Sequence, residues 1–357
     1  MDHVLRLKAL LPALSKNNLD ALVVTHMPNV RYLCGFTGSS GVLLVTPKGV
    51  TFFTDGRYTE QAAQQVKGAK VVTSKGPPVA GAAKLMARFR GALGFEGDHT
   101  TVSARQSLLN FFPTAVRLKA VQGIVESLRL LKDANELAQI RAAVNLGSEL
   151  FRPAVEAIRP GIRESQVAAE IEYAARKSGA EKMSFETIVA SGQRSALPHG
   201  VASSSPIAAK GFVILDYGVI LHGYCSDMTR TVHVGRVPLR ARQMYRSVLE
   251  AQEAAIAAVA PGVGVGKVDA AARSVLRKAK LDRYFTHSTG HGVGLEIHEQ
   301  PRVARGQTEV LRPGMVITIE PGVYLPGSGG VRIEDMVVVT ERGCEILTPT
   351  TKELIEI

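Results

Sequence analysis

Two segments of the sequence each place a pair of carboxylates around a glycine-rich centre. The first pair is Asp216 and Asp227, and the second pair is Glu320 and Glu334. In each segment a β-branched apolar run ends on the first acid, turn-forming residues follow, and the second acid leads into another apolar run. This pattern predicts two antiparallel hairpins, in which Asp216 faces Asp227 and Glu320 faces Glu334. Because four carboxylates on buried strands would repel one another and lose their hydration, we expect metal cations to hold them.

The similarity of the two segments extends to the residues before them. Arg159-Pro160-Gly161-Ile162 matches Ala260-Pro261-Gly262-Val263, and His199 matches His298 in the same order along the chain. Offsets between matching residues lie between 99 and 108. An ordered series of matches favours two copies of one helix-then-hairpin unit over chance similarity. A pseudo-twofold arrangement of the copies would bring both acidic hairpins to one central site.

A histidine among glycines completes the set of candidate ligands. His291 lies in Thr289-Gly290-His291-Gly292-Val293-Gly294, where little side-chain bulk would block a ligand. With the segments LDYG, SDMTRT, GHGVGLEIHE, EPGVY and VRIED, the five residues closely resemble the metal pentad of the M24 peptidases, which have the pita-bread fold. Residues 29–39 and 54–58 resemble the creatinase/prolidase-type N-terminal domain. The resemblance covers nearly the whole chain and implies a peptidase of the Xaa-Pro branch.

Four carboxylates and one imidazole form an oxygen-rich ligand set with room for two divalent ions, about 3.5–4 Å apart. This set favours Mn, Co, Fe or Zn over Cu, and we take Mn as the first choice. The resemblance implies that Asp227 binds one ion and His291 the other, while Asp216, Glu320 and Glu334 bridge or chelate. It also implies that a metal-bridging hydroxide attacks the peptide bond and that Glu320 carries the proton to the leaving amine.

The resemblance assigns a second group of residues to the substrate. It places His199 and His298 beside the scissile carbonyl, where they would stabilise developing negative charge. Tyr324 and Arg332 would orient the site. Arg302 resembles the prolidase arginine that holds the terminal carboxylate of a dipeptide, a task that suits the guanidinium fork. The alternative for Arg302 is a solvated loop arginine.

Length and patterning predict two domains of an α/β (α+β) protein. A chain of 357 residues exceeds one typical core. Strand-like runs such as Ala21–Val24 alternate with helical stretches in the first part, which indicates an α/β sheet. Asp133 is an expected helix N-cap because Glu136 follows three residues later. We therefore predict an N-terminal domain over residues 1–128 and a catalytic pita-bread domain over residues 129–357.

Charge and cysteine content narrow the class of protein. Residues 1–125 contain 15 Lys and Arg against 6 Asp and Glu, which gives most of the total net charge of +11. The basic residues are dispersed and no aromatic RNA-binding motif accompanies them, so we expect no nucleic-acid partner. No apolar stretch approaches the roughly 20 residues of a membrane span. The three cysteines, Cys34, Cys225 and Cys344, are too scattered for a disulfide framework, which favours the cytoplasm.

These observations favour a metal-dependent enzyme that cleaves Xaa-Pro bonds in proline-containing peptides. The sequence leaves open whether it is an Xaa-Pro dipeptidase (prolidase) or an Xaa-Pro aminopeptidase, although Arg302 favours the dipeptidase. A creatinase-like C–N hydrolase and a non-catalytic pita-bread binding module are the alternatives, and the intact ligand set argues against both. The resemblance further implies a homodimer in which Arg57, in Thr54-Asp55-Gly56-Arg57-Tyr58, contacts the partner subunit's site and its substrate.

Overall fold

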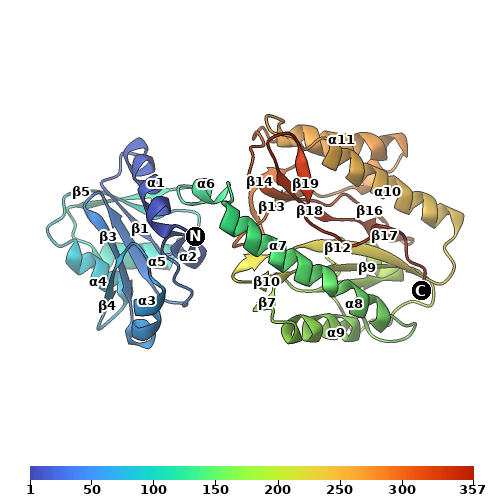
Figure 1. Ribbon diagram of the computed structural model, residues 1–357, viewed down its shortest axis with the longest axis horizontal. Helices are drawn as coiled ribbons and strands as arrows, with labels where there is room; N and C mark the ends of the chain where they lie inside the picture. The colour runs from blue at the N-terminus through green and yellow to red at the C-terminus, as the bar shows by residue number, and fades with distance from the viewer. The chain divides into compact units, whose positions relative to one another are not determined.

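A six-stranded mixed sheet organises the first part of the chain in the computed structural model, which describes residues 1–357 (Figure 1). The strand order is β4-β3-β2-β1-β5-β6, with antiparallel pairing of β1 to β2 and of β2 to β3 and parallel pairing elsewhere. The strands are β1 (Ala21–Val24), β2 (Val42–Thr46), β3 (Gly49–Thr54), β4 (Lys70–Thr73), β5 (Gly91–Glu96) and β6 (Val116–Val121). The helices around the sheet are α1 (His3–Lys16), α2 (Met27–Cys34), α3 (Thr59–Gln65), α4 (Pro78–Leu85) and α5 (Val102–Phe111).

Strand β1 is buried along its whole length, which explains its unbroken apolar sequence. Ala21 and Val23 pack in one core with Ala82 of α4 and Leu108 of α5. A strand covered on both faces has no solvent side, so its sequence does not alternate between apolar and polar residues. The strand predicted at Ala21–Val24 is confirmed with the same bounds.

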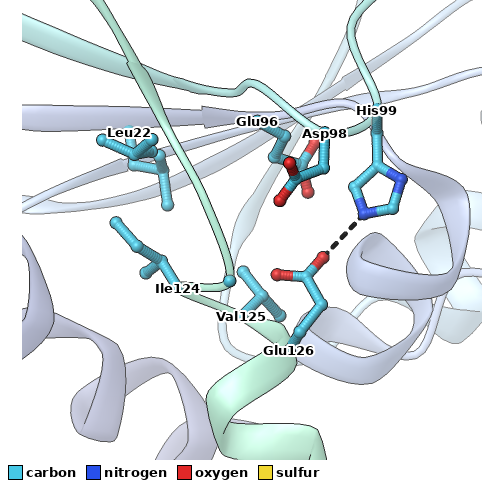
Figure 2. A pocket seen from close by; sticks show the side chains of 9 residues that line it. Leu22, Glu96, Asp98, His99, Ile124, Val125 and Glu126 are labelled. Atoms are coloured by element: carbon cyan, nitrogen blue, oxygen red, sulfur yellow. Dashed lines mark hydrogen bonds and ion pairs between the residues drawn. The ribbon is translucent and has the colours of Figure 1, made fainter. Parts of the chain in front are cut away.

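The chain divides into two compact units, Met1–Arg129 and Leu130–Ile357. The first unit ends with the short helix α6 (Glu126–Arg129), which is held to the sheet by a polar cluster. Figure 2 shows this cluster around a small pocket, where His99 Nε2 lies 2.8 Å from Glu126 Oε1. The Asn29 side-chain amide also donates to Glu126 and to Glu96 Oε1 at the end of β5. These bonds fix the end of the first unit against its own sheet.

The second unit begins with α7 (Ala134–Glu149). The Asp133 side chain accepts from the backbone N–H of Glu136, and the Glu136 side chain accepts from the backbone N–H of Asp133. This reciprocal capping box satisfies two backbone donors that a helix start leaves unpaired. The helix start predicted at Asp133 is therefore confirmed.

The rest of the second unit consists of two similar halves, each with a helix pair and its own strands (Figure 1). The first half contains α8 (Phe151–Ala157), α9 (Glu164–Lys177), β7 (Lys182–Met183), β8 (Ile188–Ser191), η2 (Gly192–Ala196), β9 (Gly211–Tyr217), β10 (Val219–Leu221), β11 (Tyr224–Cys225) and β12 (Met228–Val234). The second half contains α10 (Leu239–Ala257), α11 (Val265–Lys278), β13 (Gly290–Gly292), β14 (Glu299–Val303), β15 (Val316–Ile319), β16 (Gly322–Leu325), β17 (Gly329–Arg332), β18 (Asp335–Val339) and β19 (Cys344–Ile346).

Each helix pair covers the strands of its own half. Ile171 of α9 packs with Val213 and Leu215 of β9, whereas Val268 of α11 packs with Ile317 of β15. Figure 1 shows α8 and α9 on one outer side of these strands and α10 and α11 on the other. At the ends of the hairpins, Asp216, Asp227 and Glu334 are buried, whereas Glu320 is partly exposed. No helix in the structure has the length and apolar character needed to cross a membrane.

Candidate metal centre

Each predicted carboxylate ligand lies at or beside the end of a strand of the second unit, and the predicted histidine ligand lies within a short strand. Asp216 lies near the end of β9, Asp227 directly precedes β12, and His291 is the middle residue of β13. Glu320 directly follows β15 and Glu334 directly precedes β18. Strand ends position side chains firmly and still leave space beyond the last backbone hydrogen bond.

The first hairpin differs from the predicted register. Asp216 pairs with Thr229, not with Asp227, because β12 starts only at Met228, opposite Tyr217. The small β10–β11 hairpin takes up the chain between β9 and β12, and its turn residues His222 and Gly223 both have positive φ. The prediction that Asp216 directly faces Asp227 is therefore wrong.

The second hairpin keeps the predicted register. The paired residues of β15 and β18 end with Ile319 opposite Asp335. Glu320 and Glu334 are therefore the next residues beyond this pair, one on each side of the hairpin. The β16–β17 hairpin forms a separate sheet between them.

Three of the candidate ligands come close enough to share one ion. Asp227, His291 and Glu334 each offer a ligand atom, and these atoms lie within 4.8 Å of one another. Glu320 joins them, because His291 Nε2 lies 3.5 Å from Glu320 Oε1 and 3.5 Å from Asp227 Oδ2. His291 Nδ1 lies 3.0 Å from the carbonyl oxygen of Gly292. An Nδ1–H donated to that carbonyl leaves the Nε2 lone pair facing the carboxylates.

The electrostatics of this cluster favour the binding of positive charge. Burial, together with the neighbouring carboxylates, raises the pKa of Asp227 and of Glu334 well above the usual range. Burial also raises the pKa of Glu320 to about 7, although nearby Arg332 favours its charged form. Asp216 Oδ1 is buried and has no hydrogen-bond partner. Unpaired buried carboxylate oxygens are costly, and divalent cations would satisfy them, so the residues fit a metal centre.

The imidazole of the cluster is also suited to binding a cation. Burial lowers the pKa of His291 to about 4, so its ring is neutral near neutral pH. A neutral imidazole is the form that ligates metals.

A buried arginine links the centre to a tyrosine and a further histidine. Arg332 donates through Nη2 to Asp216 Oδ2 and through Nη1 to the Tyr324 hydroxyl at 2.6 Å. Tyr324 also contacts His287 Nε2 at 2.9 Å. Burial raises the pKa of Tyr324 to about 12 and lowers the pKa of His287 to about 3, so both are neutral near neutral pH. Arg332 thereby fixes one oxygen of Asp216 and leaves the other exposed to the centre.

His287 is a residue of this network that does not stand out in the sequence. It has no counterpart at a matching offset in the first half. The available signal is its position four residues before His291 on the segment leading into β13.

The two histidines predicted to contact the substrate are exposed in the structure. The ring of His298 lies 4.4 Å from the ring of His291, edge to face. Burial and the nearby His199 lower the pKa of His298. The loop of His199 is held by Arg332, whose Nη1 donates to the carbonyl oxygen of Pro198 at 3.0 Å. The structure thus brings His199 and His298 together on the accessible side of the cluster.

The two remaining candidates lie in different units. Arg302 pairs with His291 across β13 and β14, so the two side chains start from the same face of the sheet. Arg302 is exposed. Arg57 belongs to the first unit, where its guanidinium bonds both oxygens of Asp55 at 2.9 Å and its side chain is 72% exposed.

Comparison with known proteins identifies the family of the chain. Residues 138–341 match the description "Metallopeptidase family M24", and residues 6–131 match "Creatinase/Prolidase N-terminal domain". The chain is 41% identical over 338 residues to "Uncharacterized peptidase YqhT" of Bacillus subtilis, covering 94% of this chain and 96% of that protein. The solved structure of an Xaa-Pro dipeptidase from Bacillus anthracis has a TM-score of 0.96 at 40% identity, with 100% of both chains covered.

The chain is also similar in structure to an enzyme described as an aminopeptidase. The structure of an X-Pro aminopeptidase from Thermotoga maritima MSB8 has a TM-score of 0.88 at 34% identity, covering 95% of this chain and 97% of that one. Each of these three protein matches covers at least 94% of this chain. The chain therefore belongs to metallopeptidase family M24 and is a prolidase-like enzyme with a creatinase-type N-terminal domain and a pita-bread catalytic domain.

Proposed function

We propose that this enzyme hydrolyses the bond before proline in Xaa-Pro dipeptides with the help of two divalent ions, Mn²⁺ being the first choice. The observation that carries the proposal is the convergence of Asp227, His291 and Glu334 within 4.8 Å, next to Glu320. The Xaa-Pro dipeptidase name of the Bacillus anthracis structure supports the choice of substrate.

Five residues would hold the ions: Asp216, Asp227, His291, Glu320 and Glu334. When bound, divalent ions supply Lewis acidity and a water acidic enough to serve as a nucleophile near neutral pH. The hydrogen bond from Arg332 to Asp216 keeps that carboxylate directed into the cluster.

The protein's own groups then orient the substrate and move its protons. The exposed imidazoles of His199 and His298 would donate to the carbonyl oxygen of the scissile bond, where negative charge develops. The Glu320 carboxylate would accept a proton from the attacking water and pass it to the proline nitrogen as the bond breaks. The guanidinium of Arg302 would pair with the terminal carboxylate of the dipeptide.

The second candidate is an aminopeptidase that removes the first residue from longer peptides beginning Xaa-Pro. The similarity to the Thermotoga maritima enzyme favours it. The two activities differ in whether a substrate carboxylate must lie directly after the proline. Xaa-Pro dipeptides and Xaa-Pro-Xaa tripeptides therefore distinguish them.

The proposal is tested by removing and restoring the metal. We expect a chelator to abolish hydrolysis of Xaa-Pro dipeptides and Mn²⁺ or Co²⁺ to restore it. Asp227→Asn and His291→Ala should each bind fewer ions per chain than the wild type, as measured by elemental analysis, and should lose most of their activity. Asp282→Asn is the matched control, because Asp282 is an exposed carboxylate outside the centre whose partner is Arg277.

The same assays separate the proposal from its alternatives. Full activity in chelated, metal-free protein would rule out the metal mechanism. Unchanged metal content in both ligand variants would show that other residues bind the ions. Metal binding without turnover of any Xaa-Pro peptide would favour a binding module, and turnover confined to non-peptide C–N bonds would favour a creatinase-like hydrolase.

A further inference from the structure

Behind the candidate metal centre, a second cluster of charges is almost completely buried. Its central residue is Arg230 of β12, and its acid is Asp335, the first residue of β18. The two side chains are 2% and 1% exposed and are joined by a 2.7 Å ion pair. None of the chemistry proposed above uses either residue. A buried arginine is expensive unless its donors are satisfied, so its partners show what it holds.

All five donors of the Arg230 guanidinium have acceptors. Nε donates to the carbonyl oxygen of Thr351, and Nη2 donates to Asp335 Oδ1 and to the carbonyl oxygen of Thr350. Nη1 donates to the carbonyl oxygens of Thr229 and Glu334. Arg230 therefore connects β12 of the first half with the start of β18 in the second half and with the C-terminal segment.

The acid of this cluster is held on both oxygens. Asp335 Oδ2 accepts from Gln252 Nε2 of α10 at 2.8 Å and lies 3.0 Å from Lys352 Nζ. Lys352 Nζ also donates to Gln252 Oε1 at 3.0 Å. With Arg230 and Lys352 against one carboxylate, the charged side chains of this cluster sum to a net positive charge.

The connection to the centre runs through Glu334, the residue before Asp335. Its carbonyl oxygen is fixed by Arg230, and its backbone N–H donates to the carbonyl oxygen of Thr229 at 3.1 Å. Its carboxylate Oε2 accepts from Thr229 Oγ1 at 2.7 Å. Two consecutive residues of β12 thus hold the backbone and the side chain of Glu334. Since neighbouring residues of an extended chain point to opposite sides, anchoring Asp335 on one side directs Glu334 to the other.

We propose that Arg230, Asp335 and Lys352 form a positioning network that aims the Glu334 carboxylate and thereby sets the affinity for one metal ion. The inference rests on the proposed function insofar as it takes Glu334 as a ligand. Partners behind metal ligands commonly contribute 10- to 100-fold to metal affinity, because they fix the direction of the ligand's lone pairs. The C-terminal segment is part of this network through Lys352.

The competing explanation is that the cluster only holds the C-terminal segment, residues 350–357, against the catalytic unit, here called a fastening role. Another arginine of this chain offers the matched control. Arg242 Nη2 donates to Glu356 Oε1 at 2.6 Å, which fastens the same segment at a point that touches neither Asp335 nor Glu334. A fastening role predicts similar behaviour when either arginine is changed, whereas a positioning role predicts a difference in metal affinity.

The experiment compares wild type with Arg230→Lys, Asp335→Asn, Lys352→Met and Arg242→Lys in the full chain. Each metal-free protein is titrated with Mn²⁺ by calorimetry and by competition with a chelator, at a temperature where circular dichroism shows it fully folded. We expect Arg230→Lys and Asp335→Asn to weaken one of the two ion sites at least about tenfold, and Lys352→Met to weaken the same site less. Arg242→Lys should bind Mn²⁺ as the wild type does.

The outcomes separate this inference from the proposed function. Wild-type affinity in folded Asp335→Asn and Lys352→Met would overturn the network, even if Arg230→Lys failed to fold. Equal weakening in Arg242→Lys would also overturn it, in favour of simple fastening. A wild-type enzyme that bound no divalent ion would instead refute the proposed function, whereas binding without peptide hydrolysis would leave the affinity comparison fully informative.

Discussion

At the scale of single residues, Arg302 is the side chain on which the proposed choice between the two peptidase activities can be tested. It is exposed, and it starts from the same sheet face as His291, which is its partner across β13 and β14. An arginine in this position can reach a group bound beside the metal centre without itself ligating metal. The guanidinium fork matches a carboxylate with two parallel hydrogen bonds.

We expect Arg302→Ala to lower kcat/KM for Xaa-Pro dipeptides at least about 30-fold, equivalent to about 2 kcal/mol, because the bound proline carboxylate loses its partner. Xaa-Pro amides and Xaa-Pro-Xaa tripeptides carry no carboxylate at that point, so their kcat/KM should change far less. Arg305→Ala is the control, since Arg305 is also exposed and lies beyond the end of β14. Equal losses on dipeptide and amide would remove the case for a carboxylate partner and for the dipeptidase.

At the scale of elements, ion pairs hold the loops that carry the histidines. The Lys132 ammonium, just before α7, lies 3.1 Å from Glu299 Oε2, and the two side chains are 1% and 8% exposed. Glu299 directly follows His298, and its Oε1 accepts from the backbone N–H of Glu296. In the other half, Glu164 of α9 binds Arg194, whose Nη2 donates to the carbonyl oxygen of Val201 beside the His199 loop. Each half therefore fixes its histidine loop with a charge pair.

Breaking the Lys132 pair should destabilise the catalytic unit. We expect Lys132→Met to lower the free energy of unfolding by about 3–5 kcal/mol, because it leaves the Glu299 carboxylate buried without its cation. The denaturant midpoint of the catalytic unit's transition measures this loss. The double variant Lys132→Met/Glu299→Gln should be less destabilised than Lys132→Met, because it also removes the negative charge of the buried Glu299 carboxylate.

A surface ion pair provides the comparison for this prediction. Arg152→Met breaks the pair with Glu156, whose side chains are 86% and 62% exposed. Solvent already screens that pair, so its loss should leave the midpoint nearly unchanged. A Lys132→Met protein as stable as Arg152→Met would show that the buried pair contributes no more than a surface one.

At the scale of the whole molecule, we propose that the enzyme is a homodimer, as its resemblance to prolidases implies. The candidate contact is Arg57, which the structure shows exposed in the first unit and ordered by Asp55. An exposed guanidinium that is already oriented loses little freedom when it meets a partner.

Light scattering should therefore give twice the mass of one chain. Arg57→Ala should raise KM and leave the melting temperature nearly unchanged. Arg90→Ala is the control, because Arg90 is another arginine of the same unit and its guanidinium donates to the neighbouring carbonyl oxygen of Phe89. A monomer with full activity would contradict the dimer, and an unchanged KM in Arg57→Ala would contradict the role of Arg57.

Much of the architecture could be predicted because it is encoded locally. The strand at Ala21–Val24 is an unbroken apolar run, and the start of α7 needs only Asp133 and Glu136, three residues apart. The turn at His222 and Gly223 follows from residues that tolerate positive φ. The four candidate carboxylate ligands could be selected because carboxylates beside buried apolar runs require compensation for their lost hydration. His291 could be selected because it lies among glycines.

Local sequence patterns were enough to predict the fold, the family and the residues that gather at the centre. Three contacts became visible only in the folded protein: the pairing of Asp216 with Thr229, the bond between His287 and Tyr324, and the ion pair of Arg230 with Asp335. The difference lies in how far apart along the sequence the interacting residues are. Periodicity and capping depend on residues a few positions apart, whereas Arg230 and Asp335 meet only because two halves of the catalytic unit pack against each other. Their hydrogen bonds cannot be predicted from local sequence. The residues adjacent in sequence to a strand arginine are the same whether its side chain faces water or a buried carboxylate.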